Sequence, residues 1–329
     1  MRICLVTPVS PGARTGNATT AGRWARLLRD LGHRVEVRGR YDGQPADLLV
    51  ALHARRSADS VERFAATRPG RPVVVALTGT DLYHDIHHDP AAARTLERAT
   101  AFVVLQALGL DQLPDRLRQR TWIIHQSALA PPAVPAPLAR CFEVCVSANL
   151  RPVKDPLRAA EAARLLPADS RLVVSHLGHA LDDDLEAAAR AEMATNPRYR
   201  WLGGRPPRQA LRLMGRSRLL VLSSWSEGGA NVVSEAIALG VPVVSSHIAG
   251  SIGILGEDHP GYFTPGDTEE LATLLARAER QPAWLEELRQ RSLRLRPLVD
   301  PQRERGEWAR LLAAVTATPG PAPAPAPAS

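Results

Sequence analysis

The chain has 329 residues, 45% of them hydrophobic, and its 41 basic and 34 acidic side chains give a formal net charge of +7. This length exceeds that of one ordinary hydrophobic core and predicts two domains. The sequence has no signal-peptide pattern and no apolar run near the roughly 18 residues of a membrane span, which favours a cytoplasmic protein without a membrane segment. Its aromatic content is 4% and its arginines are scattered, which argues against nucleic-acid binding. The positive charge favours a small phosphorylated substrate instead.

The first half of the chain alternates short apolar runs with helical patterns. Trp24, Leu27, Leu28 and Leu31, for example, follow the i, i+3, i+4, i+7 spacing of one helix face. Strands are predicted at residues 2–7, 34–38, 47–52, 72–77, 101–105 and 121–124. This alternation predicts the α/β class with a parallel sheet.

The loop after the first predicted strand contains two glycines and leads into a helix, which makes it a possible anion site. The candidate residues in it are Gly12, Arg14, Thr15, Gly16 and Asn17. Many strand-to-helix loops contain glycine without binding a ligand, so the spacing alone leaves both interpretations open. Further on, the histidines at 84, 87 and 88 lack a cysteine or carboxylate at a metal-binding spacing, and we expect no metal or other cofactor.

Residues 131–137 are rich in proline and read as a stiff linker. After them comes a predicted strand at 141–147, a loop, and a helix from 157 to 166. Lys154, in that loop, is the only lysine of the chain. An ammonium group is a compact charge well suited to phosphate oxygens. The alternative is a surface lysine that persists by chance in an arginine-rich chain.

Residues 218–245 read as strand, tight loop, helix and strand. Gly228, Gly229 and Ala230 leave the backbone bare where the helix begins, which suits a phosphate group. Glu227 and Glu235 supply carboxylates that can accept hydrogen bonds from vicinal sugar hydroxyls. The segment therefore predicts a nucleotide-sugar site. The alternative is that both glutamates are solvated residues near a helix start.

The end of the chain completes the predicted organisation. Residues 303–315 form an amphipathic helical pattern, and the Pro/Ala-rich residues 318–329 are expected to be disordered. The predicted domains are 1–130 and 138–300, joined by the linker 131–137 and followed by a helix at 301–317 and the tail 318–329.

Glu227 and Glu235 with the seven residues between them, followed by Ala-x-x-x-Gly-x-Pro-Val-Val, resemble the donor motif of family 4 glycosyltransferases. The resemblance implies the GT-B fold: two facing Rossmann-like domains, an acceptor domain first and a donor domain second, with a C-terminal crossover helix. It implies that Glu235 binds the ribose of UDP, that Glu227 binds the donor sugar, and that Lys154 contacts the diphosphate. Asn149 stands where the family has an arginine, and Arg151 is the candidate for the second charge. The remaining donor-side candidates are Gly203, Ser226, Gly228, Gly229, Ala230 and Asn231.

The first half resembles a narrower group within that family. Residues 10–17, 52–57, 77–83, 104–106, 125–128 and 150–156 resemble the selenosugar synthases of selenoneine biosynthesis. Thr78 stands where many members of the wider family have a histidine. The resemblance to selenosugar synthases implies that selenophosphate attacks C1 of UDP-N-acetylglucosamine or UDP-glucose. The acceptor-side candidates are Arg14, Thr15, His53, Arg55, Arg56, Thr78, Gly79, Thr80 and Asp81. A transferase with a carbohydrate or lipid acceptor and a non-catalytic nucleotide-sugar-binding regulator remain as alternatives.

Overall fold

The computed structural model describes residues 1–8 and 15–317, and it places two six-stranded parallel sheets in two compact units. Unit 1 comprises Met1–Gln126 together with the chain from Gln302 on, and unit 2 comprises Ser127–Pro301. The predicted α/β class with parallel sheets in two Rossmann-like domains is confirmed. Within the described ranges, no helix is long and apolar enough to cross a membrane.

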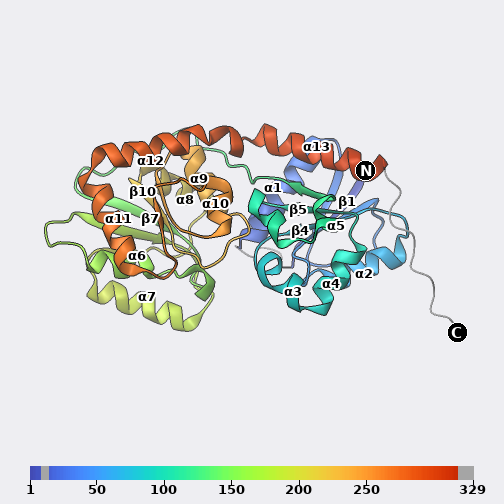
Figure 1. Cartoon of the computed structure of the whole chain (residues 1–329), viewed down its shortest axis with the longest axis horizontal. Coiled ribbons are helices and arrows are strands. Elements are labelled where there is room, and N and C mark those ends of the chain that lie inside the picture. Colours follow the sequence, from blue (N-terminus) through green and yellow to red (C-terminus); the bar gives the residue numbers. More distant parts are fainter. Residues whose placement is uncertain (9–14, 318–329) are drawn as a thin grey trace. The chain divides into compact units, whose positions relative to one another are not determined.

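Unit 1 has the strand order β2-β1-β3-β4-β5-β6 (Figure 1). Its strands are β1 (Arg2–Val6), β2 (Arg34–Arg38), β3 (Leu48–Leu52), β4 (Val73–Leu77), β5 (Ala101–Val104) and β6 (Thr121–Ile123). Its helices and helical turns are α1 (Gly16–Asp30), α2 (Ala58–Thr67), η1 (Asp81–Asp85), α3 (Ile86–His88), α4 (Pro90–Arg98), η2 (Ala107–Gln112), α5 (Asp115–Arg118) and α13 (Pro301–Ala317). All six predicted strands are present, and no end differs from the prediction by more than one residue.

Helices cover both faces of the unit 1 sheet, so the inner strands β1, β3, β4 and β5 are buried on both sides and are continuous apolar runs. Alternate strand residues such as Leu5 and Val50 pack against α1 and α13, while their neighbours such as Val6 and Ala51 pack against α2, α4 and α5. This two-sided core fixes the strand register, because a one-residue slip would exchange the two faces.

Helix α13 joins unit 1 although it lies at the far end of the sequence (Figure 1). Trp308 is fully buried and packs edge-to-face on Trp24 of α1, with ring centroids 4.8 Å apart. Glu304 is 1% exposed; its carboxylate accepts a 2.7 Å hydrogen bond from the Trp24 indole and pairs with Arg23 at 3.1 Å. A buried carboxylate needs such partners, so they tie α13 to α1.

Unit 2 has the strand order β12-β11-β10-β7-β8-β9. Its strands are β7 (Phe142–Ser147), β8 (Leu172–Leu177), β9 (Tyr199–Trp201), β10 (Leu219–Leu222), β11 (Val243–Ser246) and β12 (Tyr262–Phe263). Its helices and helical turns are η3 (Pro152–Lys154), α6 (Arg158–Arg164), α7 (Asp183–Thr195), α8 (Pro207–Arg216), α9 (Asn231–Leu239), α10 (Ala249–Leu255), α11 (Thr268–Arg280), α12 (Pro282–Arg294) and η4 (Arg296–Val299).

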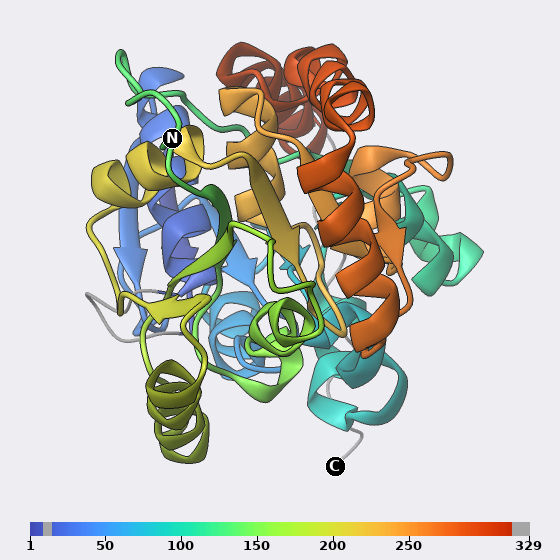
Figure 2. The same cartoon turned by 90° about the vertical axis from the view of Figure 1, so that its left-hand side faces the viewer.

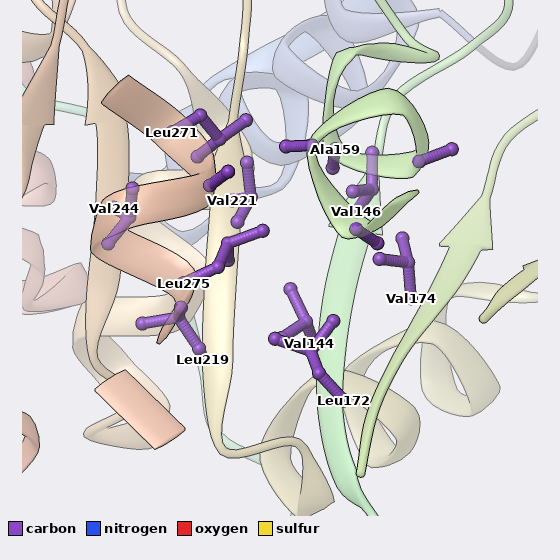
Figure 3. Close-up of a cluster of buried hydrophobic side chains, with 14 of the residues drawn as sticks. Val144, Val146, Ala159, Leu172, Val174, Leu219, Val221, Val244, Leu271 and Leu275 are labelled. Carbon is purple, nitrogen blue, oxygen red and sulfur yellow. The ribbon is translucent and has the colours of Figure 1, made fainter. Parts of the chain in front are cut away.

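The unit 2 sheet is also covered on both faces. Helices α6 (light green) and α11 (orange) lie side by side over one face, where Ala159, Leu271 and Leu275 meet alternate residues of the central strands (Figures 2 and 3). Helices α8, α9 and α10 cover the opposite face around Cys145 and Leu220. The three cysteines of the chain are free, including Cys145 on β7 and Cys141 just before it.

Both sheets have a point where the strand order reverses. In unit 1 it lies between β1 and β3, and in unit 2 between β7 and β10. Helices that follow the two central strands leave on opposite faces at such a point, which opens a crevice beyond the carboxyl ends of those strands. Ligand-binding residues are therefore expected after β1 and β3 in unit 1, and after β7 and β10 in unit 2.

The proline-rich residues 131–137 form neither helix nor strand. The division between the units falls at 126/127 and at 301/302, so residues 127–130 lie with unit 2. The amide of Ala128 donates to the carbonyl of Val299 at 3.1 Å, which holds this segment on unit 2. The predicted tail, 318–329, lies outside the described residues.

Candidate functional site

The lone lysine and the first glutamate of the donor motif meet in unit 2. Lys154 Nζ lies 2.6 Å from Glu227 Oε1, and the Ser224 hydroxyl donates to the same oxygen at 2.7 Å. The Lys154 side chain is 26% exposed and that of Glu227 is 11% exposed, so the pair faces solvent on its lysine side. Lys154 follows β7 and Glu227 follows β10, which places the pair at the strand-order reversal.

Backbone contacts between the two loops hold this pair in place. The Trp225 amide donates to the Val153 carbonyl at 2.9 Å. The Ser223 hydroxyl donates to the carbonyls of Lys154 and Asp155 at 3.2 and 2.8 Å. Asp155 has a left-handed φ of 43°, which ends the short turn η3 right after the lysine. The lysine is thus held on a rigid turn.

Helix α9 begins beside the ion pair with an uncapped end. Its N-cap residue is Ala230, which has no side chain able to accept from the first amides, and its first turn contains no acidic residue. Gly250 explains how closely the loop is packed: a Cβ there would lie 2.0 Å from the Glu227 carbonyl oxygen. Helix α9 thus begins four residues after Glu227, and the positive end of its dipole carries no acidic side chain from its own first turn.

The other donor-side candidates surround this point. Glu235 is the fifth residue of α9 and is half-buried, and Ser226 precedes Glu227 in the loop. Asn231 opens α9, after Gly228 and Gly229. Arg151 precedes η3, is half-buried, and makes no ion pair within the described residues. A second positive charge is thus present on the lysine turn.

Asn149 has a structural contact that its sequence position does not reveal. Its Oδ1 accepts a 2.9 Å hydrogen bond from the amide of His179, which joins the loop after β7 to the loop after β8. The His179 ring lies against Gly204, where a Cβ would come within 1.9 Å of the imidazole, and Gly203 beside it has a φ of 69°. His179, absent from the predicted set, therefore belongs to the ligand edge of unit 2.

A buried histidine underlies these loops. His176 Nδ1 lies 2.7 Å from the Tyr199 hydroxyl and its Nε2 lies 2.8 Å from the Ala148 carbonyl oxygen. The Ala148 carbonyl can only accept, so Nε2 carries the proton and Nδ1 accepts from the tyrosine. The neutral imidazole thus supports the start of the 148–150 loop.

Unit 2 should lose stability in mild acid because of His176. Burial lowers the pKa of this imidazole to about 4, against about 6.5 in an unfolded chain. Between those pH values the unfolded chain binds a proton that the folded unit does not, so the free energy of unfolding falls as the pH falls, by roughly 3 kcal/mol in total. Urea unfolding at several pH values should show a shallower pH slope for His176→Gln. A pH slope in His176→Gln equal to that of wild type would contradict the assignment.

In unit 1 the predicted acceptor-side residues converge after β3 and β4. His53 is 3% exposed and has a left-handed φ of 71°. Its Nε2 lies 3.1 Å from the Thr80 hydroxyl, and its Nδ1 accepts from the Arg56 amide at 3.5 Å. Burial lowers the pKa of the His53 imidazole, which favours the neutral ring.

Asp81 has a structural position in this cluster. Its carboxylate is fully buried and accepts 2.9 Å hydrogen bonds from the backbone amides of Ala54, Thr78 and Gly79. These bonds hold the loop after β3 against the loop after β4. Asp81 is one of the predicted acceptor-side candidates, and the structure turns its carboxylate inward, toward these backbone amides.

The neighbouring arginines differ in their surroundings. Arg55 pairs with Asp85 at 3.2 Å and with Asp89 at 3.7 Å, two carboxylates that the sequence interpretation did not connect with it. Arg56 is exposed and makes no ion pair with any residue in the described ranges. The two arginines predicted to act together are therefore not equivalent.

The loop after β1 is only partly described. Thr15 is the N-cap of α1, where its hydroxyl accepts from the Ala18 amide at 3.4 Å, and Gly16 and Asn17 form the first turn of the helix. Gly12 and Arg14 lie outside the described residues.

The chain resembles known proteins both in sequence and in fold. Residues 141–293, within unit 2, match the family model of glycosyl transferases group 1. A stretch of 70 residues is 36% identical to TuaC of Bacillus subtilis (strain 168), which is named as a teichuronic acid biosynthesis glycosyltransferase; the match takes in 21% of this chain and 18% of TuaC. Unit 2 thus carries the sequence pattern of the group 1 glycosyl transferases.

Solved structures resemble the whole chain in fold. HepE from Anabaena, in complex with UDP and glucose, matches with a TM-score of 0.76 and 18% identity over 95% of this chain and 100% of HepE. The sucrose-phosphate synthase of Thermosynechococcus elongatus matches with a TM-score of 0.75 and 14% identity over 96% of this chain and 99% of its own. The two Rossmann-like units are those of the GT-B fold.

Proposed function

We propose that this chain is a glycosyltransferase whose donor is a UDP-sugar. The observation that carries the proposal is the meeting of Lys154 and Glu227 beside the uncapped start of α9, at the strand-order reversal of unit 2. An ammonium group and helix amides suit a diphosphate, and a carboxylate suits sugar hydroxyls. The group 1 sequence pattern of residues 141–293 supports the same interpretation.

These groups can act at the bond that breaks. When the C1–O bond of a UDP-sugar breaks, its electron pair stays with the diphosphate, where negative charge grows. We assign the stabilisation of that charge to Lys154 and the start of α9, with Arg151 as the second cation. Glu235 is assigned to the ribose and Glu227 to the donor sugar; Glu227 Oε1 takes the Lys154 and Ser224 contacts, and a carboxylate has a second oxygen to accept from a sugar hydroxyl.

For the acceptor we propose selenophosphate. The selenium would form a bond to C1 as UDP leaves, and water would then break the P–Se bond to give phosphate and a 1-selenosugar. This finer proposal is supported by the resemblance of the unit 1 motifs to selenosugar synthases and by Thr78 in place of a histidine. A selenium nucleophile is soft and strong, so it needs less help from a general base than a hydroxyl does.

Mass spectrometry of the reaction products would test the proposal. The protein is incubated with UDP-N-acetylglucosamine or UDP-glucose and selenophosphate, and we expect UDP, phosphate and a product with the selenium isotope pattern. UDP release with sugar acceptors but not with selenophosphate would instead establish a conventional acceptor, the alternative that the names of TuaC and sucrose-phosphate synthase favour. Tight UDP-sugar binding without turnover under any acceptor would indicate a regulator.

A further inference from the structure

Two adjacent arginines, Arg55 and Arg56, follow β3, and only Arg56 lacks a carboxylate partner among the described residues. The Arg55 guanidinium lies against the carboxylates of Asp85 and Asp89, which offset its charge. Arg56 faces solvent with no carboxylate partner among the residues that the structure describes. A planar guanidinium of this kind binds the oxygens of a tetrahedral anion through two parallel N–H bonds.

The hydrogen bonds of His53 determine how the nearby Thr80 hydroxyl is oriented. Because the Arg56 amide donates to Nδ1, that nitrogen holds a lone pair and the ring proton is on Nε2. Nε2–H then donates to the Thr80 hydroxyl oxygen at 3.1 Å. The hydroxyl hydrogen of Thr80 must point elsewhere, and since Thr80 is exposed, it is available to an acceptor atom of a ligand.

The position of this group and its backbone also favour a ligand site. His53 follows β3, one of the two strands at the reversal in the unit 1 strand order. A left-handed φ at a buried histidine costs free energy and is typical of functional sites. The Asp81 carboxylate, with three backbone amides, holds both loops so that His53 and Thr80 stay in contact.

We propose that Arg56 and Thr80 bind the tetrahedral oxyanion of the acceptor, and that His53 is a positioning residue that directs the Thr80 hydroxyl toward it. Arg55 instead stabilises the turn η1 through its ion pair with Asp85 and takes no part in anion binding. This inference rests on the acceptor being a phosphate-type anion, as proposed above. It divides the predicted acceptor set into groups that contact the ligand and groups that hold them.

The arginine assignment can be tested with a matched pair of variants. Arg56→Gln and Arg55→Gln remove one positive charge from adjacent positions, so their long-range effect on an anion is nearly equal. We expect Arg56→Gln to weaken binding of inorganic thiophosphate, followed by 31P NMR titration, by roughly tenfold to a hundredfold, as for a lost charge-assisted hydrogen bond. Arg55→Gln should change it by less than threefold. Equal losses in both variants would overturn the division.

The role of His53 is tested by rescue. His53→Leu and Thr80→Val should each raise the KM for selenophosphate about tenfold with little change in kcat, the expected size for one hydrogen bond. His53→Gln, whose amide can still donate to Thr80, and Thr80→Ser, which keeps the hydroxyl, should restore most of the affinity. Circular dichroism and thermal unfolding check that each variant folds. If His53→Leu left the KM unchanged in a folded protein, or if His53→Gln failed to rescue, the positioning role would be wrong.

The thiophosphate titration separates this inference from the proposed function. If wild-type protein forms no selenosugar but binds thiophosphate in an Arg56-dependent manner, the anion site stands and selenophosphate is the wrong acceptor. If selenosugar forms with equal KM in wild type and Arg56→Gln, the proposed function stands and the anion site is wrong.

Discussion

Replacing Lys154 with alanine is expected to lower kcat for sugar transfer by roughly a hundredfold to a thousandfold, as for loss of one preorganised charge-stabilising group. The physical reason is that the leaving diphosphate would lose the ammonium at the end of β7, beside the start of α9. The free energy of unfolding should change by about 1 kcal/mol or less, because the pair is partly exposed and Glu227 keeps its bond from Ser224. UDP release under saturating substrates measures the first quantity and urea unfolding the second.

Two companion variants sharpen this experiment. Lys154→Arg keeps the charge but replaces a compact ammonium with a larger planar group, and it should recover only part of the rate. Glu227→Gln removes the ion pair while leaving the lysine free for the diphosphate, so UDP should bind at least as tightly as to wild type. A kcat within threefold of wild type in Lys154→Ala would show that the lysine has no part in the reaction.

Replacing Trp308 with alanine is expected to destabilise unit 1 by about 3–5 kcal/mol, the range for a large buried aromatic side chain. Trp308 is fully buried against Trp24, and its indole N–H has no hydrogen-bond partner among the described residues, so the loss is one of packing. Arg310→Ala is the matched control on the same helix, since its side chain is 67% exposed. It should change stability by about 0.5 kcal/mol or less.

Amide hydrogen exchange would locate the effect of Trp308→Ala. We expect protection to fall in β1, β3 and α1, which share the core of α13, and to remain in unit 2. An equal loss of protection in β7 and β10 would show that α13 is not confined to the core of unit 1.

The sequence predicted the strands and the polar loops at their carboxyl ends, because apolar runs and the loops after them are local features. It did not predict the contact between Lys154 and Glu227, which are 73 positions apart and meet because β7 and β10 are neighbours in the sheet. Asn149 was singled out as a donor-side candidate because it stands where the resembling family has an arginine. Its contact with the His179 amide comes from the pairing of β7 with β8, which a motif does not contain.

The acceptor-side residues also depend on contacts that a sequence pattern does not contain. Arg55 and Arg56 are chemically identical and adjacent, so no pattern distinguishes them. Only the position of Asp85, in a turn that returns to the end of β3, assigns Arg55 to an ion pair. His53, by contrast, was predicted as a candidate. Which of its ring nitrogens donates a hydrogen bond depends on the amide of Arg56, three residues later in the chain.

The placement of α13 in unit 1 has a consequence for synthesis on the ribosome. Domains commonly fold in the order in which they emerge, yet unit 1 receives its last core helix only after the whole of unit 2 has been made. Until then Trp24 and its neighbours on α1 lack the apolar surface that covers them in the native state. Unit 2, which is continuous in sequence, is therefore expected to be the first of the two to reach its native state in the nascent chain.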